Sequence, residues 1–189
     1  MPLTPVGLAG VLVPNLAACG QIGVAVPQFA LAVGTGVSTF AAASIVTSAD
    51  TGLLGTGATA IPLLVPQPLL LSSLLTGFTA TATLGVMAPL LATGLANGLN
   101  VGFLQGLITM AHPSVGFGAG VAKVIPKDAV PSMIAGFAAV GMTGTSSVKM
   151  ATAIGIALTI VFTALTLPVP IMGAPGTLPG AGVGIGKIV

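Results

Sequence analysis

The stretch Ala30-Leu-Ala-Val-Gly-Thr-Gly-Val37 recurs without gaps as Ala92-Thr-Gly-Leu-Ala-Asn-Gly-Leu99 and as Ala151-Thr-Ala-Ile-Gly-Ile-Ala-Leu158. The three copies start 62 and 59 residues apart. Internal repetition at such a period is typical of chains that stack one structural unit or arrange it in a ring. Each copy lies within a longer apolar stretch, and these stretches predict long helices over residues 28–47, 89–110 and 148–167.

Each long helix is expected to have the same neighbours in the sequence. A shorter helix precedes it, over residues 14–22 in the first copy and 69–81 in the second. A strand with alternating glycines follows it, at 55–61, 118–125 and 182–189. The predicted fold class is therefore mainly α with short β-strands, in three tandem helix–turn–helix–strand repeats of about 60 residues. The predicted division is an N-terminal segment 1–9 and repeats 10–65, 66–127 and 128–189, forming one integrated structural unit.

Charged residues are very scarce in this chain. Only 3% of its 189 residues are charged and 54% are hydrophobic, whereas about 25% of residues are charged in a typical soluble protein. Most of the surface must therefore face lipid or protein rather than bulk water. The net charge of +2 is spread too thinly to form a specific nucleic-acid surface, which needs clustered Lys and Arg.

The residues that usually carry chemistry are also scarce. The chain has one histidine, His112, and one cysteine, Cys19. Neither a catalytic triad nor a metal-ligand cluster is indicated. The stretch 180–186 is rich in glycine, but it lacks the Gly-Lys-Ser/Thr ending of a phosphate-binding loop. We therefore expect no enzyme activity, no cofactor and no metal site.

Glycine positions predict an assembly interface instead. Four glycines of the second long helix are spaced four apart and share one face, on which another backbone can pack closely. Further glycines leave one face of each later strand without side chains, and these strands are expected to pair with another repeat or another chain, with Lys123 and Lys187 at the rim. The predicted interface residues are Gly94, Gly98, Gly102, Gly106, Gly118, Gly120, Gly182, Gly184 and Gly186.

The last third of the chain resembles a known class of proteins. The stretch from Gly141 to Gly155 (Gly-Met-Thr-Gly-Thr-Ser-Ser-Val-Lys-Met-Ala-Thr-Ala-Ile-Gly), a proline-glycine connector and the ending Gly182-Val-Gly-Ile-Gly-Lys-Ile-Val189 are similar to small Gly/Ala/Thr-rich structural proteins of tailed-phage virions. The resemblance implies a non-enzymatic virion component. Its partners would be copies of itself and other virion proteins.

The alternative is an integral membrane protein. Each of the three predicted long helices has about the twenty residues that a bilayer requires. The absence of Trp and Tyr weighs against this alternative, because spanning helices usually carry aromatic residues at both interfaces. The expected location is therefore the virion, with the membrane as the alternative.

Overall fold

The computed structural model describes the backbone of most of the chain and the side chains of its helical part. Backbone structure is described for residues 3–43, 45–51, 56–59, 67–81, 85–104, 107–111, 117–125, 128–164, 167–173 and 181–187. Side chains are described for residues 3–42, 68–81, 85, 87–101 and 128–164.

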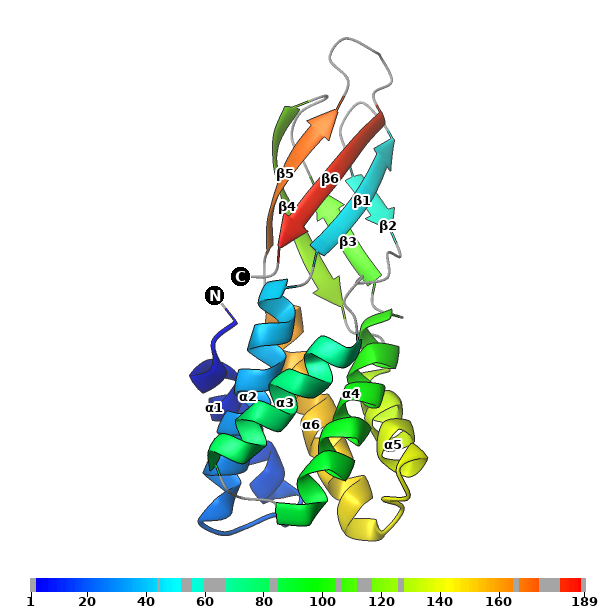
Figure 1. Cartoon of the computed structure of the whole chain (residues 1–189). Helices are drawn as coiled ribbons and strands as arrows, with labels where there is room; N and C mark the ends of the chain where they lie inside the picture. The colour runs from blue at the N-terminus through cyan, green and yellow to red at the C-terminus, as the bar shows by residue number, and fades with distance from the viewer. Residues whose placement is uncertain are drawn as a thin grey trace.

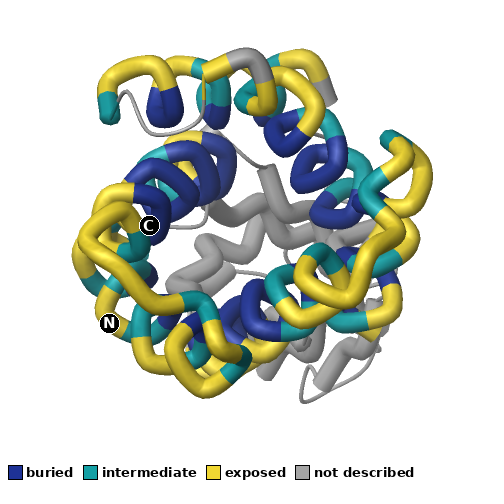
Figure 2. Tube along the Cα trace, turned by 90° about the horizontal axis from the view of Figure 1, so that it is seen from below, coloured by how far each residue is buried: buried dark blue, intermediate teal, exposed yellow. Residues whose placement is uncertain are grey.

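Six α-helices form a ring at one end of the molecule (Figure 1). Each helix packs on the next helix in chain order, and the last closes onto the first. The end-on view shows buried residues on the inner side of this ring and exposed residues on the outer side (Figure 2). The helices are α1 (Pro5–Ala18), α2 (Ala25–Ala43), α3 (Gln67–Thr81), α4 (Ala88–Leu104), α5 (Ala129–Ala139) and α6 (Thr145–Ala164); the short 3-10 helix η1 (Gly85–Met87) precedes α4.

Two helices of the ring end in the same glycine turn. At the end of α1, the Gly20 N–H donates to the Ala17 carbonyl and the Gln21 N–H donates to the Leu16 carbonyl. At the end of α5, the N–H groups of residues 141 and 142 make the corresponding bonds. The two glycines have φ values of 82° and 80°, which lie in the left-handed region that glycine adopts most readily.

The buried core repeats along the chain with the same spacings as the sequence. Residues 62 and then 59 positions apart occupy equivalent core sites, on the short helices α1, α3 and α5 and on the long helices α2, α4 and α6. All of them are at most 2% exposed. The four sets are Leu12, Leu74 and Met133; Leu16, Phe78 and Phe137; Val33, Leu95 and Ile154; and Val37, Leu99 and Leu158.

Two strands follow each pair of helices, and they form one six-stranded antiparallel sheet at the other end of the molecule (Figure 1). The sheet order is β1-β6-β5-β4-β3-β2, so it follows the chain in the same way as the helical ring. The strands are β1 (Ile45–Thr51), β2 (Thr56–Thr59), β3 (Leu107–Ala111), β4 (Phe117–Ile125), β5 (Leu167–Gly173) and β6 (Ala181–Lys187).

The fold class predicted from the sequence is wrong. The part of the chain whose side chains are described is entirely helical and contains no strand, so it is not built from helix–turn–helix–strand units. The β segments form a separate sheet and come in pairs rather than one after each long helix. The physical reason is that a lone strand leaves its backbone N–H and C=O groups unpaired, whereas neighbouring antiparallel strands satisfy them.

The predicted helix boundaries were also wrong in three places. The first short helix spans Pro5–Ala18 rather than 14–22, and Thr4 caps it by accepting a hydrogen bond from the Gly7 N–H. The first two long helices end at Ala43 and Leu104 rather than at 47 and 110. In both cases the residues expected to extend the helix belong to strands, β1 and β3.

Candidate assembly surfaces and an axial pocket

The glycine face of α4 makes a close helix contact within the chain. A Cβ atom built on Gly98 would lie 2.9 Å from the Cα of Met133 and 2.9 Å from the carbonyl oxygen of Ser132, both on α5. From the opposite side, a Cβ atom on Gly136 would lie 2.5 Å from the backbone nitrogen of Gly98. The contact with Gly94 completes this backbone-to-backbone approach.

The same contact recurs one unit earlier, between α2 and α3. A Cβ atom on Gly36 would lie 3.1 Å from the Cα of Leu74, and one on Gly77 would lie 2.7 Å from the carbonyl oxygen of Ala32. These positions precede those of the α4–α5 contact by the repeat spacings. Glycine therefore lets neighbouring units of the ring pack closely, and two of the predicted interface residues, Gly94 and Gly98, already have a partner inside the chain.

The other predicted interface glycines lie towards the sheet. Gly102 is in α4, Gly118 and Gly120 pair with Ile171 and Val169 of β5, and Gly182, Gly184 and Gly186 pair with Asp50, Ser48 and Val46 of β1. Gly106 lies outside the described residues. Lys123 and Lys187 pair with Thr109 and Ile45, and the placement of their side chains at a rim stays a prediction, as does an assembly role for all these residues.

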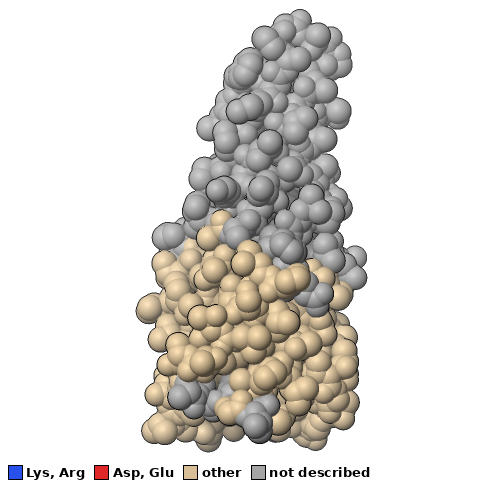
Figure 3. Space-filling view, in the orientation of Figure 1, with Lys and Arg blue, Asp and Glu red and all other residues tan. Residues whose placement is uncertain are grey.

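The outer surface of the helical ring carries almost no charge. Of the six charged residues in the sequence, only Asp128 and Lys149 fall among the residues with described side chains. Figure 3 shows one face of the ring, where the described surface has neither acidic nor basic side chains in view. Ten large hydrophobic residues are exposed instead: Val6, Ile22, Val24, Leu31, Met87, Leu90, Val101, Val148, Ile156 and Ile160.

The hydroxyl groups on these helices are satisfied by the helices themselves. The Oγ1 of Thr39 donates to the carbonyl of Thr35 at 2.9 Å, and that of Thr159 donates to the carbonyl of Gly155 at 2.8 Å. The same bond back to the preceding turn is made by Thr35, Thr76, Thr79, Thr93 and Thr152. A hydroxyl that already has an acceptor loses less on leaving water, so this surface is suited to being covered.

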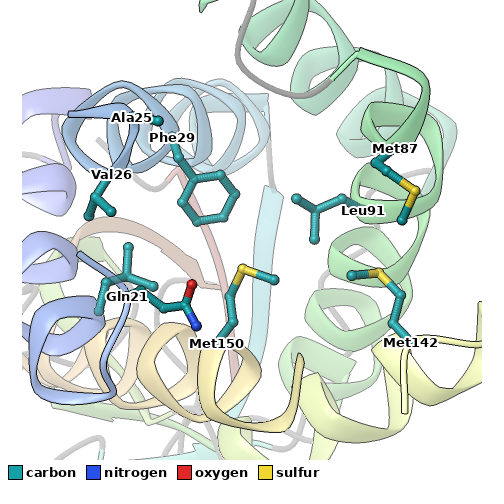
Figure 4. Close-up of a pocket in the computed structure, with 9 residues that line it drawn as sticks. Gln21, Ala25, Val26, Phe29, Met87, Leu91, Met142 and Met150 are labelled. Carbon is teal, nitrogen blue, oxygen red and sulfur yellow. The ribbon is translucent and has the colours of Figure 1, made fainter. Parts of the chain in front are cut away.

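An apolar pocket opens at the end of the ring that faces away from the sheet. Its volume is about 290 Å³. Figure 4 shows Phe29 of α2 facing Leu91 of α4 across the pocket, with Met150 of α6 beside them. The remaining lining residues are Leu16, Gln21, Ala25, Val26, Met87 and Met142.

Three of the lining residues occupy equivalent positions in the three units. Phe29, Leu91 and Met150 are 62 and 59 residues apart, and each lies near the start of a long helix. Because α2, α4 and α6 alternate around the ring, these residues converge on the middle of its open end. The sequence analysis missed this pocket, although the residue before each of the three aligned segments, or the corresponding column, marks it.

Two contacts fix the walls of the pocket. The ring of Phe29 stacks on that of Phe78, with centroids 5.8 Å apart and an angle of 6° between the planes. At the mouth, the Nε2 of Gln21 donates to the Oγ of Ser146 at 3.0 Å and so joins the end of α1 to the start of α6.

The described part of the chain offers little for catalysis. No group of three metal-binding side chains occurs among the described residues, and no ionisable side chain lines the axial pocket. His112 lies outside the described residues, and Cys19 is a half-buried free thiol. Comparison with family models, curated proteins and solved structures found no match for this chain.

Proposed function

We propose that this chain is a non-enzymatic structural protein of a large symmetric assembly, most plausibly a tailed-phage virion, and that it acts by packing against copies of itself and other virion proteins. The observation that carries the proposal is the outer surface of the helical ring. That surface exposes ten large hydrophobic residues, while only two charged residues fall in the part with described side chains. Contiguous apolar surface of this kind marks an interaction site in soluble proteins.

The threefold recurrence supports a place on a symmetry axis. Three equivalent helix pairs surround one axis, and their core residues repeat at constant spacings. A chain built in this way presents three similar faces to its surroundings. Neighbours related by a threefold or sixfold axis can therefore contact equivalent sites on a single copy.

The lengths of the helices favour protein neighbours over lipid. Two helices, α2 and α6, are long and apolar enough to cross a membrane, and buried core helices meet the same criteria. The helices between them, α1, α3 and α5, have 14, 15 and 11 residues. A bilayer requires about 20 residues per spanning helix, so half of the ring is too short to span it.

Expression of the full-length chain without detergent tests the proposal. We expect it to form particles or large oligomers that sediment in the absence of membranes and appear as regular objects by negative-stain electron microscopy. Recovery in the membrane fraction, with release only by detergent, would support the membrane protein instead. A monodisperse monomer in detergent-free buffer would contradict both functions.

A matched pair of variants locates the surface that assembles. Ile160 lies on the outer side of α6 and is 49% exposed, so Ile160→Lys should preserve helical content and abolish assembly. Ile160→Val keeps the surface apolar and should assemble normally. Assembly of the lysine variant with unchanged yield would exclude this face of α6 from the contact.

A further inference from the structure

The axial pocket has the character of a binding site rather than of a packing defect. Side chains from α1, α2, α4 and α6 and from two connections converge on it, and it is open at the end of the ring. The aromatic wall is held in place by the stacking of Phe29 on Phe78. Small-molecule sites are usually preformed apolar concavities of this kind with a few polar groups.

The chemistry of the lining selects an uncharged ligand. Eight of the nine lining residues are apolar, and the ninth is the neutral amide Gln21. A charged headgroup drawn into such a pocket would lose its hydration without gaining an ionic partner. A hydroxyl at the end of a ligand could donate to the amide oxygen of Gln21, whose Nε2 is held by Ser146.

The shape and flexibility of the lining favour a chain over a rigid ring system. Met87, Met142 and Met150 line the mouth and one side (Figure 4), and methionine side chains adapt to an elongated, flexible partner. A cavity of about 150 Å³ holds one benzene molecule. The volume of about 290 Å³ is roughly twice as large and therefore suits a ligand of about twelve non-hydrogen atoms.

We propose that the pocket lined by Phe29, Leu91 and Met150 binds a neutral, unbranched aliphatic chain of medium length with its polar end near Gln21. The chain enters from the end of the ring that faces away from the sheet. Its source is either a free aliphatic alcohol or the acyl chain of a neutral lipid, because both present the same chemistry to the pocket. This site is separate from the outer surface that the assembly proposal uses.

Methionine methyl groups provide a direct probe of the site. The full-length protein with ¹³C-labelled methionine methyl groups is titrated with n-octanol, and the resonances are assigned from single Met→Leu variants. We expect saturable shifts of the signals from Met87, Met142 and Met150. Met133, which is buried between α4 and α5 and does not line the pocket, serves as the internal control and should not shift.

A matched pair of tryptophan variants tests the location of the site. Met87 at the mouth is 47% exposed and Ile160 on the outer surface is 49% exposed, so both positions tolerate a larger side chain. Met87→Trp should obstruct the mouth and raise the dissociation constant of octanol at least about tenfold, which is about 1.4 kcal/mol. Ile160→Trp should leave it unchanged, and both variants must keep the helical circular dichroism of the unmodified protein.

The outcomes separate the proposal from nonspecific binding and from other ligand classes. Absence of saturable shifts, an equal shift of Met133, or equal weakening by the two tryptophan variants would each overturn it. Octanoate that binds as tightly as octanol would overturn the requirement for a neutral ligand. Phosphatidylcholine vesicles then distinguish the two sources: cosedimentation of the protein, lost in Met87→Trp, identifies a lipid chain, and its absence identifies a free alcohol.

Discussion

Gly136→Ala tests whether close backbone contact between neighbouring units holds the ring together. A Cβ atom at this position would lie 2.5 Å from the backbone nitrogen of Gly98 and 2.8 Å from its Cα, and it would also clash with the carbonyl oxygen of Gly94. All three atoms belong to the backbone of α4, so no side-chain rotation can relieve the overlap. Helices α4 and α5 must therefore move apart or the methyl group must remain strained.

The expected magnitude follows from two opposing effects. Overpacking a core typically costs about 1–3 kcal/mol, and a contact with backbone on every side belongs at the upper end. Replacing glycine by alanine in a helix contributes about 1 kcal/mol in the other direction. The net loss in the free energy of unfolding is therefore about 2 kcal/mol, which lowers the melting temperature of a chain of this size by roughly 4–8 °C.

Gly10→Ala is the matched control. Gly10 lies within α1, and a Cβ atom built on it would meet nothing within 4 Å. The same chemical change should therefore stabilise the protein by about 1 kcal/mol. Thermal and urea unfolding followed by circular dichroism measure both variants, and a Gly136→Ala protein at least as stable as the unmodified chain would refute the close contact.

Three further substitutions test other parts of the ring by the same unfolding measurements. Thr4→Ala removes the hydroxyl that caps α1 and should cost about 1 kcal/mol; no loss would mean that the cap is not formed. Phe78→Ala empties a core site that is 1% exposed and removes the stacking on Phe29, so we expect a loss of about 3–5 kcal/mol, and a loss below that of Thr4→Ala would contradict its burial. Gly141→Ala forces a left-handed φ of 80° on alanine at a cost of about 1–2 kcal/mol, whereas Gly144, with open space around it and no positive φ, should accept alanine freely.

The spacing of the helical units could be predicted from the sequence because the repeat is local information. The columns that align Ala30, Ala92 and Ala151 also align the buried residues of the ring. All three of these alanines are completely buried, since small residues at that position allow the helices to approach. A chain that repeats its core positions at fixed spacings repeats its packing as well.

The ends of the helices could not be predicted, because distant residues determine them. Ile45 follows an apolar helical stretch and continues its hydropathy, so the pattern alone extends the helix. In the structure Ile45 pairs with Lys187 at the other end of the chain, and Leu107 pairs with Ile125. The strand propensity of β-branched residues becomes decisive only when a partner strand is present.

The role of the glycine face could not be predicted for a different reason. A row of small residues on a helix indicates that another backbone comes close, and it does not indicate whether that backbone belongs to the same chain. Gly98 meets Met133 of the same chain. Gly98→Leu should therefore disturb the α4–α5 contact within each copy, and any loss of assembly would follow from that disturbance.

Which surface remains for assembly follows from what the chain already covers. The glycine faces are occupied by neighbouring helices of the ring, and the strand glycines lie in pairs within the sheet. The described surface left over is the outer side of the helices and the open end, where Ile22 and Val24 are 85% and 95% exposed. A solvated surface would carry Lys and Glu for solubility, whereas this one carries aliphatic side chains and threonines bonded to their own helices. Neighbours that cover it would displace water from apolar groups without stranding a charge, and this is the physical basis on which we assign the outer surface to assembly.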